Sequence, residues 1–223
     1  MILQPMLNGN IQAALIGLLA ALFVIFVPLT LHEWAHAWSA YKLGDPTAKN
    51  MGRKTLNPMA HIDYLGALMI IFVGFGWAKP VPVNQRNFAN PKKDMALSAA
   101  AGPLSNLVFA YILMLTANLL LFGGILQQIP LLQQFFVIAI HINILLMAFN
   151  LLPVPPLDGS RILFAFLPDR LYYKMQQYER YTMLIVFALM IFGVTRAILN
   201  PMIAFVWRIL NFLAFGPLLG ITA

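Results

Sequence analysis

The chain is 223 residues long, of which 61% are apolar and only 9% are charged. An average soluble domain is about 45–50% apolar and about 25% charged, so this composition excludes a soluble enzyme and a disordered chain. No Asp, Glu, Lys or Arg occurs from Met95 to Leu157, a run that can hold two bilayer-spanning helices of about 20 residues each. The sequence therefore predicts an all-α polytopic membrane protein.

The first apolar segment runs from Ile11 to Leu31 and is expected to continue as a helix to about Leu43. Gly44 is a typical residue for ending a helix. Pro28 lies inside the segment and predicts a kink, because proline cannot donate the helical hydrogen bond. The kink is expected just before the polar cluster that begins at His32.

The next apolar piece, residues 64–77, is too short to be a span. A helix of that length reaches only about 21 Å, whereas the hydrocarbon core is about 30 Å thick. Gly74 and Gly76 interrupt it, and the Pro-rich residues 78–84 that follow are typical of extended chain. We expect a re-entrant element followed by an extended segment.

The remaining apolar segments predict four more spans, for about five in all. The expected spans are Ala96–Phe122, Phe135–Leu152, Tyr181–Leu199 and Met202–Leu219, with an uncharged connection at 123–134 and a tight turn at Asn200-Pro201. We expect one membrane-embedded domain over residues 1–223, with a catalytic core at about 11–170 and a C-terminal helix pair at about 181–219. The last two helices carry no recognisable signature, and the oligomeric state is not indicated.

The basic residues predict the orientation. Twelve of the 14 lie in three segments, 37–63, 78–95 and 153–180, which share one side if residues 64–77 are re-entrant. Because cytoplasmic loops collect Lys and Arg, we expect a multi-pass cell-membrane protein with its N-terminus outside. The C-terminus and the active-site opening would then be cytoplasmic. This bias also explains the net charge of +7, and nucleic acid is not an expected partner because no basic cluster is interleaved with aromatic residues.

The chemistry is concentrated in His32-Glu33-Trp34-Ala35-His36. Histidines four residues apart lie on one helical face, so both rings can reach a single Zn²⁺. Glu33 is placed to take a proton from a metal-activated water. A charged group inside a bilayer helix costs about 2.5–3.5 kcal/mol, so its presence points to function. The alternative left open is that the cluster lies at the interface and merely caps the span.

A catalytic zinc site has three protein ligands and one open position. Asp158 follows an apolar span and a proline-rich break at 153–156, which holds the backbone open near membrane depth. It is therefore the preferred third ligand. The pair His61 and Asp63 could also bind metal, but a turn before the re-entrant element is the preferred interpretation. The acidic residues in loops are expected to be solvated: Asp45, Asp94, Asp169 and Glu179.

These residues fall in two motifs that resemble those of the site-2 protease family of intramembrane zinc metalloproteases. One is H-E-x-x-H, and the other is N-x-x-P-x-P-x-L-D-G, found here at Asn150–Gly159. Further matches to compact bacterial members, which lack PDZ and CBS domains, lie at 44–47, 56–58, 76–84 and 101–106. The likeness covers about residues 15–170.

The resemblance implies one zinc ion held by His32, His36 and Asp158, with Glu33 as the general base. It also implies a membrane-anchored protein substrate that is cut in or near its transmembrane segment within the lipid bilayer. Asn150 would contact the substrate or the oxyanion, although an amide that bonds the backbone remains open. For Asn106 a substrate contact is the weaker hypothesis, and an interhelical hydrogen bond is preferred.

Two other functions compete with proteolysis. A non-proteolytic metal-binding membrane protein, such as a transporter, would use the same ligands. It would not need Glu33, and it would want several polar residues along a pathway, which residues 95–157 scarcely provide. A pseudoprotease that binds transmembrane segments is disfavoured by the complete set of ligands and base.

Overall fold

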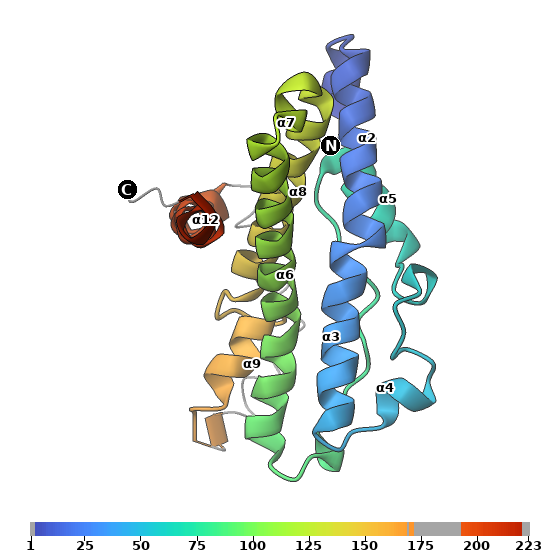
Figure 1. Ribbon diagram of the computed structural model, residues 1–223. Helices are drawn as coiled ribbons and strands as arrows, with labels where there is room; N and C mark the ends of the chain where they lie inside the picture. Colours follow the sequence, from blue (N-terminus) through green and yellow to red (C-terminus); the bar gives the residue numbers. More distant parts are fainter. Residues whose placement is uncertain (1–2, 169, 172–192, 220–223) are drawn as a thin grey trace.

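The computed structural model describes residues 3–168, 170–171 and 193–219, and these ranges contain helices and irregular chain but no strand. Four helices form the upright bundle in Figure 1: α2 (Ile11–Phe26), α3 (Pro28–Lys42), α6 (Pro91–Phe122) and α8 (Pro130–Asn150). The other helices are α1 (Leu3–Leu7), α4 (Thr47–Asn50), α5 (Tyr64–Val73), α7 (Ile125–Gln128), α9 (Asp158–Phe164) and α12 (Val194–Leu219). The described part has four helical stretches long and apolar enough to cross a membrane: 11–42, 91–122, 130–150 and 197–214. The predicted all-α membrane fold is confirmed.

The first span is broken where proline predicts it. Val27 separates α2 from α3, and Pro28 occupies the first turn of α3, where a missing N–H costs nothing. Helix α3 ends at Lys42, and Gly44 then takes a φ of 106°, a conformation that favours glycine. The polar cluster at residues 32–36 consequently lies within α3, one turn after the break.

The re-entrant element is a hairpin whose two arms pack together. The Asp63 carboxylate caps α5 by accepting the Gly66 N–H at 2.9 Å. A Cβ atom on Gly66 would lie 2.1 Å from the Trp77 carbonyl oxygen, so only glycine allows this approach. The Lys79 N–H donates to the His61 carbonyl at 2.8 Å. The chain therefore leaves α5 and returns to the level at which it entered.

Helices α6 and α8 both begin earlier than predicted, each with a proline in the first turn. In α6 the Asp94 carboxylate accepts the Asn90 N–H at 2.8 Å, which caps the new start. Asp94 is buried as a result, so the expectation of a solvated carboxylate is wrong. At the other end of α8, residues 151–157 are irregular, as the prolines predict.

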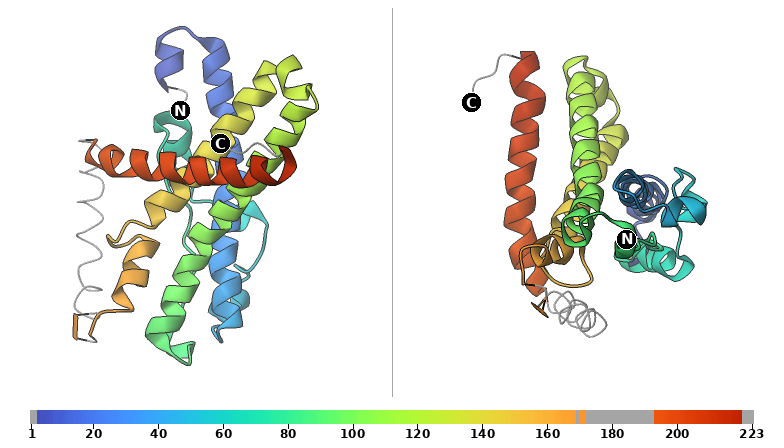
Figure 2. Two further views of the ribbon diagram at one scale, coloured as in Figure 1. Left: turned by 60° about the vertical axis from the view of Figure 1, so that its left-hand side comes forward. Right: turned by 90° about the horizontal axis from the view of Figure 1, so that it is seen from below.

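The predicted turn at Asn200-Pro201 is wrong, because α12 continues through both residues. Proline removes one helical hydrogen bond, and the packing of the helix on α6 and α8 keeps the rest of the ladder in place. Figure 2 shows α12 lying across α6 and α8 rather than alongside them. Most of the predicted span 181–199 lies outside the described residues.

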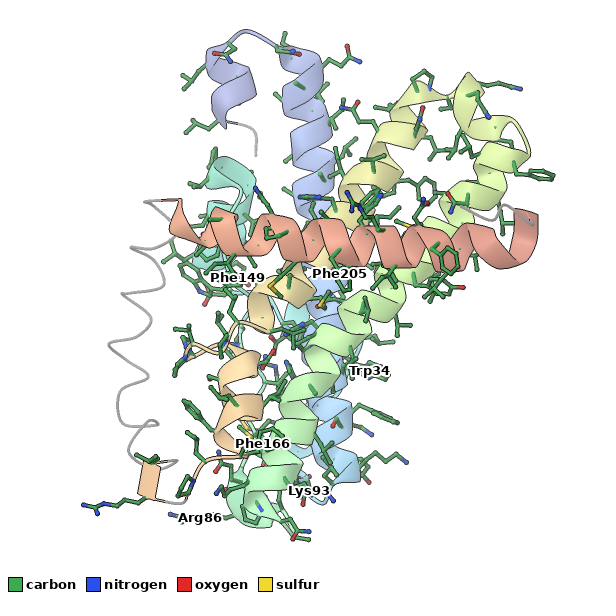
Figure 3. All side chains as sticks on the ribbon, turned by 90° about the vertical axis from the view of Figure 1, so that its left-hand side faces the viewer. Trp34, Arg86, Lys93, Phe149, Phe166 and Phe205 are labelled. Carbon is green, nitrogen blue, oxygen red and sulfur yellow. The ribbon has the colours of Figure 1, made fainter. Side chains whose placement is uncertain are left out.

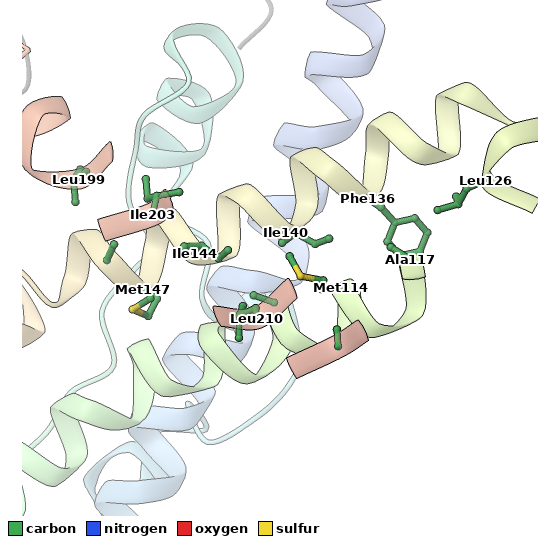
Figure 4. Packing of buried hydrophobic residues seen from close by; sticks show 13 residues of the cluster. Met114, Ala117, Leu126, Phe136, Ile140, Ile144, Met147, Leu199, Ile203 and Leu210 are labelled. Atoms are coloured by element: carbon green, nitrogen blue, oxygen red, sulfur yellow. The ribbon is translucent and has the colours of Figure 1, made fainter. Parts of the chain in front are cut away.

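Two apolar clusters hold the bundle together. In the larger one, shown in Figure 4, Leu199, Ile203 and Leu210 of α12 pack on α6 and α8, where Met114 and Ile144 are almost fully buried. The second joins α2, α5 and α8 through Ala20, Ala21, Val24, Ile25, Ile70 and Ile142. Because lipid chains are as apolar as these residues, close packing rather than exclusion from water stabilises such contacts.

Polar loops gather at one end of the bundle. The loop after α3 and the chain before α6 lie at the lower end in Figure 1, whereas the α1–α2 turn and α7 lie at the upper end. Figure 3 shows Arg86 and Lys93 at this lower end. Two of the three basic segments of the sequence thus share one end.

Candidate metal centre

Three side chains from two separate elements converge inside the bundle. His32 and His36 extend from α3, and their Nε2 atoms are 3.0 Å apart. Asp158, the first residue of α9, places Oδ2 at 3.2 Å from each of these nitrogens. Asp158, which the sequence predicts as the third ligand, thus lies close enough to the two histidines to hold a metal ion with them.

Each histidine ring is held by a hydrogen bond from its other nitrogen. His32 Nδ1 lies 2.7 Å from Asn106 Oδ1, and His36 Nδ1 lies 2.8 Å from the Ser98 carbonyl oxygen. The Asn106 amide nitrogen faces the Pro28 carbonyl at 3.3 Å, which fixes the oxygen toward His32. Since both partners are acceptors, both Nδ1 atoms carry the proton, and both Nε2 lone pairs face the centre.

The spacing of the three ligand atoms fits zinc. A tetrahedral ion with bonds of about 2.0–2.1 Å holds its ligand atoms about 3.3 Å apart. The observed separations of 3.0–3.2 Å are close to that value. The donor set of two imidazoles and one carboxylate is also one that zinc prefers, and three protein ligands leave a fourth position for water or substrate.

Gly102 lets α6 approach the ligand rings. A Cβ atom at this position would lie 2.3 Å from His36 Nε2 and 2.7 Å from His32 Cε1. The run of small residues at 99–102 predicts close helix contact, and at Gly102 the contact is made with the rings of His32 and His36. Any larger residue at 102 would occupy the space that the rings need.

A second glycine shapes the loop that presents Asp158. A Cβ atom on Gly159 would lie 2.2 Å from the Leu151 carbonyl oxygen, so the chain folds back tightly on the end of α8. The Ser160 hydroxyl donates to the Leu157 carbonyl at 2.7 Å and closes the turn. These contacts hold the carboxylate at the start of α9 without a helical connection to α8.

Glu33 contacts the extended segment that follows the re-entrant hairpin. Residues 75–84 lie outside any helix, and the extended chain predicted for 78–84 falls within this irregular stretch. The Val81 backbone N–H donates to Glu33 Oε2 at 2.8 Å. No sequence pattern predicts this contact, because Glu33 and Val81 are 48 positions apart.

A buried carboxylate lies near the same segment. Asp45 is completely buried, so the expectation that it is solvated is wrong. Its oxygens accept hydrogen bonds from Thr47, from the Asn84 N–H at 2.7 Å and from the Asn87 amide at 2.6 Å. Burial alone would raise the pKa of the Asp45 carboxyl, but these hydrogen bonds outweigh it and hold the pKa below its ordinary value.

The amide residues differ in their placement. Asn106 makes the interhelical contacts that the sequence favours, with His32 and with Asn143 of α8. Sequence reasoning missed Asn143, although a polar amide within an apolar span was itself a signal. The Asn150 amide nitrogen donates to the Leu146 carbonyl at 2.9 Å, and its substrate role stays a prediction.

The alternative metal pair is not assembled. The Asp63 carboxylate caps α5, and His61 Nε2 lies 2.8 Å from the Thr55 carbonyl oxygen. The group of His, Asp and Glu residues that could hold a metal ion in the described part is His32, His36 and Asp158.

Comparison with known proteins points to one family. The model of peptidase family M50 matches residues 125–193, a range that contains Asp158 but not α3. The chain is 43% identical over 182 residues to "Putative zinc metalloprotease YwhC" of Bacillus subtilis, an alignment covering 80% of this chain and 83% of YwhC. Rip2 of Mycolicibacterium smegmatis and MJ0611 of Methanocaldococcus jannaschii carry the same description. Rip2 is 31% identical over 59% of this chain and 51% of its own length. MJ0611 is 29% identical over 44% of this chain and 49% of its own length. No solved structure matches the chain.

Proposed function

The chain belongs to peptidase family M50, and on that premise we propose that His32, His36 and Asp158 hold the zinc ion of this intramembrane endopeptidase. The observation that carries the proposal is the meeting of two Nε2 atoms and one carboxylate oxygen within 3.2 Å. The enzyme is then of the H-E-x-x-H type, with Glu33 as its general base.

The proposed mechanism assigns one task to each side chain. Zinc, when bound, supplies Lewis acidity that polarises the scissile carbonyl and makes water a better nucleophile. Glu33 takes a proton from the attacking water and later delivers it to the leaving amide nitrogen. The Val81 N–H fixes the direction of the Glu33 carboxylate before the substrate arrives. Asn106 and the Ser98 carbonyl keep the two ligand rings in place.

We propose that the substrate is a membrane-anchored protein cut in or near its transmembrane segment. A helical peptide bond is shielded by its own hydrogen bonds, so the substrate must unwind at the site. An unwound peptide can pair with residues 79–84 as an added strand. Pro80 and Pro82 have no N–H, whereas Val81 and Val83 do, and alternate N–H groups of an extended chain point to the same edge. Because the Val81 N–H donates to Glu33, a peptide beside this edge lies against the base, and Val83 carries the next N–H along the edge.

Asn150 is proposed to steady the oxyanion that forms on the scissile carbonyl. The role requires its side chain to turn away from the Leu146 carbonyl, to which it now donates.

We place the N-terminus outside and the site opening on the cytoplasmic side. The gathering of basic loops at the end toward which α3 runs from the metal centre supports this orientation.

The experiment compares wild type with Glu33→Gln and Asp158→Ala in cells and after purification. Glu33→Gln is expected to keep one zinc per chain and to lose at least 100-fold in cleavage, because the ligands remain while the base is gone. Asp158→Ala is expected to lose both the bound zinc and the cleavage activity. New protein termini that map inside transmembrane segments, formed with wild type but not with Glu33→Gln, identify substrates. Bound zinc without any Glu33-dependent terminus would refute the proposal and favour a metal-binding protein or a pseudoprotease.

A further inference from the structure

We propose that Asp45 and Arg53 are positioning residues for the peptide substrate. From outside the metal centre they fix the two ends of the 79–84 segment, so that its N–H edge lies against Glu33. The inference rests on the proposed function, because it concerns how the peptide is brought to that site. Neither residue touches the metal ligands, and both lie in the polar chain that follows α3.

Arg53 holds the beginning of the segment. Its Nη2 donates to the Lys79 carbonyl at 2.7 Å and to the Pro80 carbonyl at 3.3 Å. The Lys79 N–H donates in turn to the His61 carbonyl at 2.8 Å. Both backbone groups of Lys79 are thereby attached to residues 53–61, two positions before Val81, whose N–H meets Glu33.

Asp45 holds the other end of the segment. Its Oδ2 accepts the Asn84 N–H at 2.7 Å, and its Oδ1 accepts the Asn87 amide at 2.6 Å. The partners are 39 and 42 residues away in sequence, so these bonds join distant parts of the chain. By contrast, the bonds from Thr47 to Oδ1 are local and close only the turn that begins at Asp45.

The charges of both residues argue for more than loop packing. Asp45 is fully buried and Arg53 is 8% exposed, and neither forms an ion pair within the described residues. A buried charge without a counter-ion is costly unless its hydrogen bonds compensate for it. Arg53 donates to the Lys79 and Pro80 carbonyls, and Asp45 accepts the Asn84 N–H besides its bonds from Thr47 and Asn87, so both charges act on the position of residues 79–84. Between these two anchors, the Val81 backbone nitrogen lies 2.8 Å from Glu33 Oε2.

Asp45→Asn tests the hydrogen bond between Asp45 Oδ2 and the Asn84 N–H. An amide keeps one acceptor oxygen and replaces the other with an NH₂ donor. Oδ1 faces the Thr47 and Asn87 donors, so the amide oxygen takes that side and the NH₂ faces the Asn84 N–H. The variant therefore detaches Asn84 and keeps the turn. Thr47→Val is the matched control, because it removes a hydroxyl from the same cluster and leaves the Asn84 bond intact.

Spin labels report the position of the segment without reference to catalysis. The chain has no cysteine, so cysteines introduced at Lys42 and the exposed Asn84, whose backbone N–H is kept, or at Lys42 and Lys79, are unique labelling sites. Asp45→Asn is expected to broaden the 42–84 distance distribution and leave the 42–79 distribution narrow. Arg53→Lys, which keeps the charge but cannot serve both carbonyls equally well, is expected to do the reverse. It also provides a second test if Asp45→Asn does not fold.

Cleavage is measured on a single-span reporter that wild type cuts in a Glu33-dependent manner. Asp45→Asn is expected to raise KM and lower kcat/KM at least tenfold while zinc per chain stays unchanged, whereas Thr47→Val stays within twofold of wild type. Unchanged kcat/KM despite a displaced segment would overturn the inference, as would broadening of both distances together with zinc loss. Absence of any Glu33-dependent cleavage by wild type would instead refute the proposed function.

Discussion

Gly102→Ala places a methyl group against both histidine ligands. The added Cβ would lie 2.3 Å from His36 Nε2 and 2.7 Å from His32 Cε1, distances below the 3.0 Å that real Cβ contacts essentially never cross. The rings cannot turn away freely, because Asn106 and the Ser98 carbonyl hold their Nδ1 atoms. Overpacking of this kind costs about 1–3 kcal/mol. If the strain falls on the ligand arrangement, zinc binds about 5–150-fold more weakly.

A loss of zinc affinity in Gly102→Ala separates displacement of the histidine rings from a general change in the stability of α6. Alanine favours a helix over glycine by about 1 kcal/mol, so a generic effect on α6 would stabilise the protein. Gly123→Ala is the matched control, since its Cβ would make an ordinary 3.5 Å contact at the end of the same helix. Zinc affinity is measured by titration against a competing chelator. Wild-type affinity in Gly102→Ala would refute the placement of the rings against α6.

Two further predictions concern the amides beside His32 and the buried Asp45 carboxylate. Asn106→Leu is expected to weaken zinc binding about 10–100-fold, because His32 Nδ1 loses its acceptor, and the same titration checks it. Asn143→Leu, which touches only Asn106, is expected to have a smaller effect, and equal losses would contradict this ranking. The lowered pKa of Asp45 means that its stabilisation is complete above its ordinary value of about 3.9 and is lost as the pH falls through the folded-state pKa. The melting temperature of Asp45→Asn should therefore lie below that of wild type at pH 7 and converge with it in acid, and a gap that does not depend on pH would contradict the assignment.

The meeting of His32, His36 and Asp158 was predictable because their placement obeys local rules. Two histidines at i and i+4 must share a helical face, whatever the helix packs against. A proline-rich break after an apolar span must leave a non-helical loop, and Asp158 is the acidic residue at its end. Scarcity helped as well, since the chain has only seven acidic residues and no cysteine. Few other assignments of three ligands were open.

The contacts that a sequence does not reveal are those between distant polar groups. Asp45 looks like any loop carboxylate, and only the fold brings Asn84 and Asn87 to it. The continuation of α12 through Pro201 has the same origin, because packing on α6 and α8 outweighs the local preference for a turn. In both cases tertiary contacts outweigh the local preference, which is a solvated carboxylate at Asp45 and a turn at Pro201.

The side chains on the two sides of Glu33 are held in place differently: the histidine rings by helix packing, and residues 79–84 by hydrogen bonds. The two therefore differ in which substitutions can move them. The ligands are fixed by packed helices, through Gly102 on α6 and the tight turn at Gly159, where one added carbon collides. The 79–84 segment is fixed by hydrogen bonds from polar residues outside the apolar bundle. A change in the loop at 45–61 can therefore shift the segment without touching a ligand, whereas a change in α6 cannot avoid the ligands. If residues 79–84 bind the peptide as proposed, peptide selection can change through the polar loop while the metal chemistry stays constant.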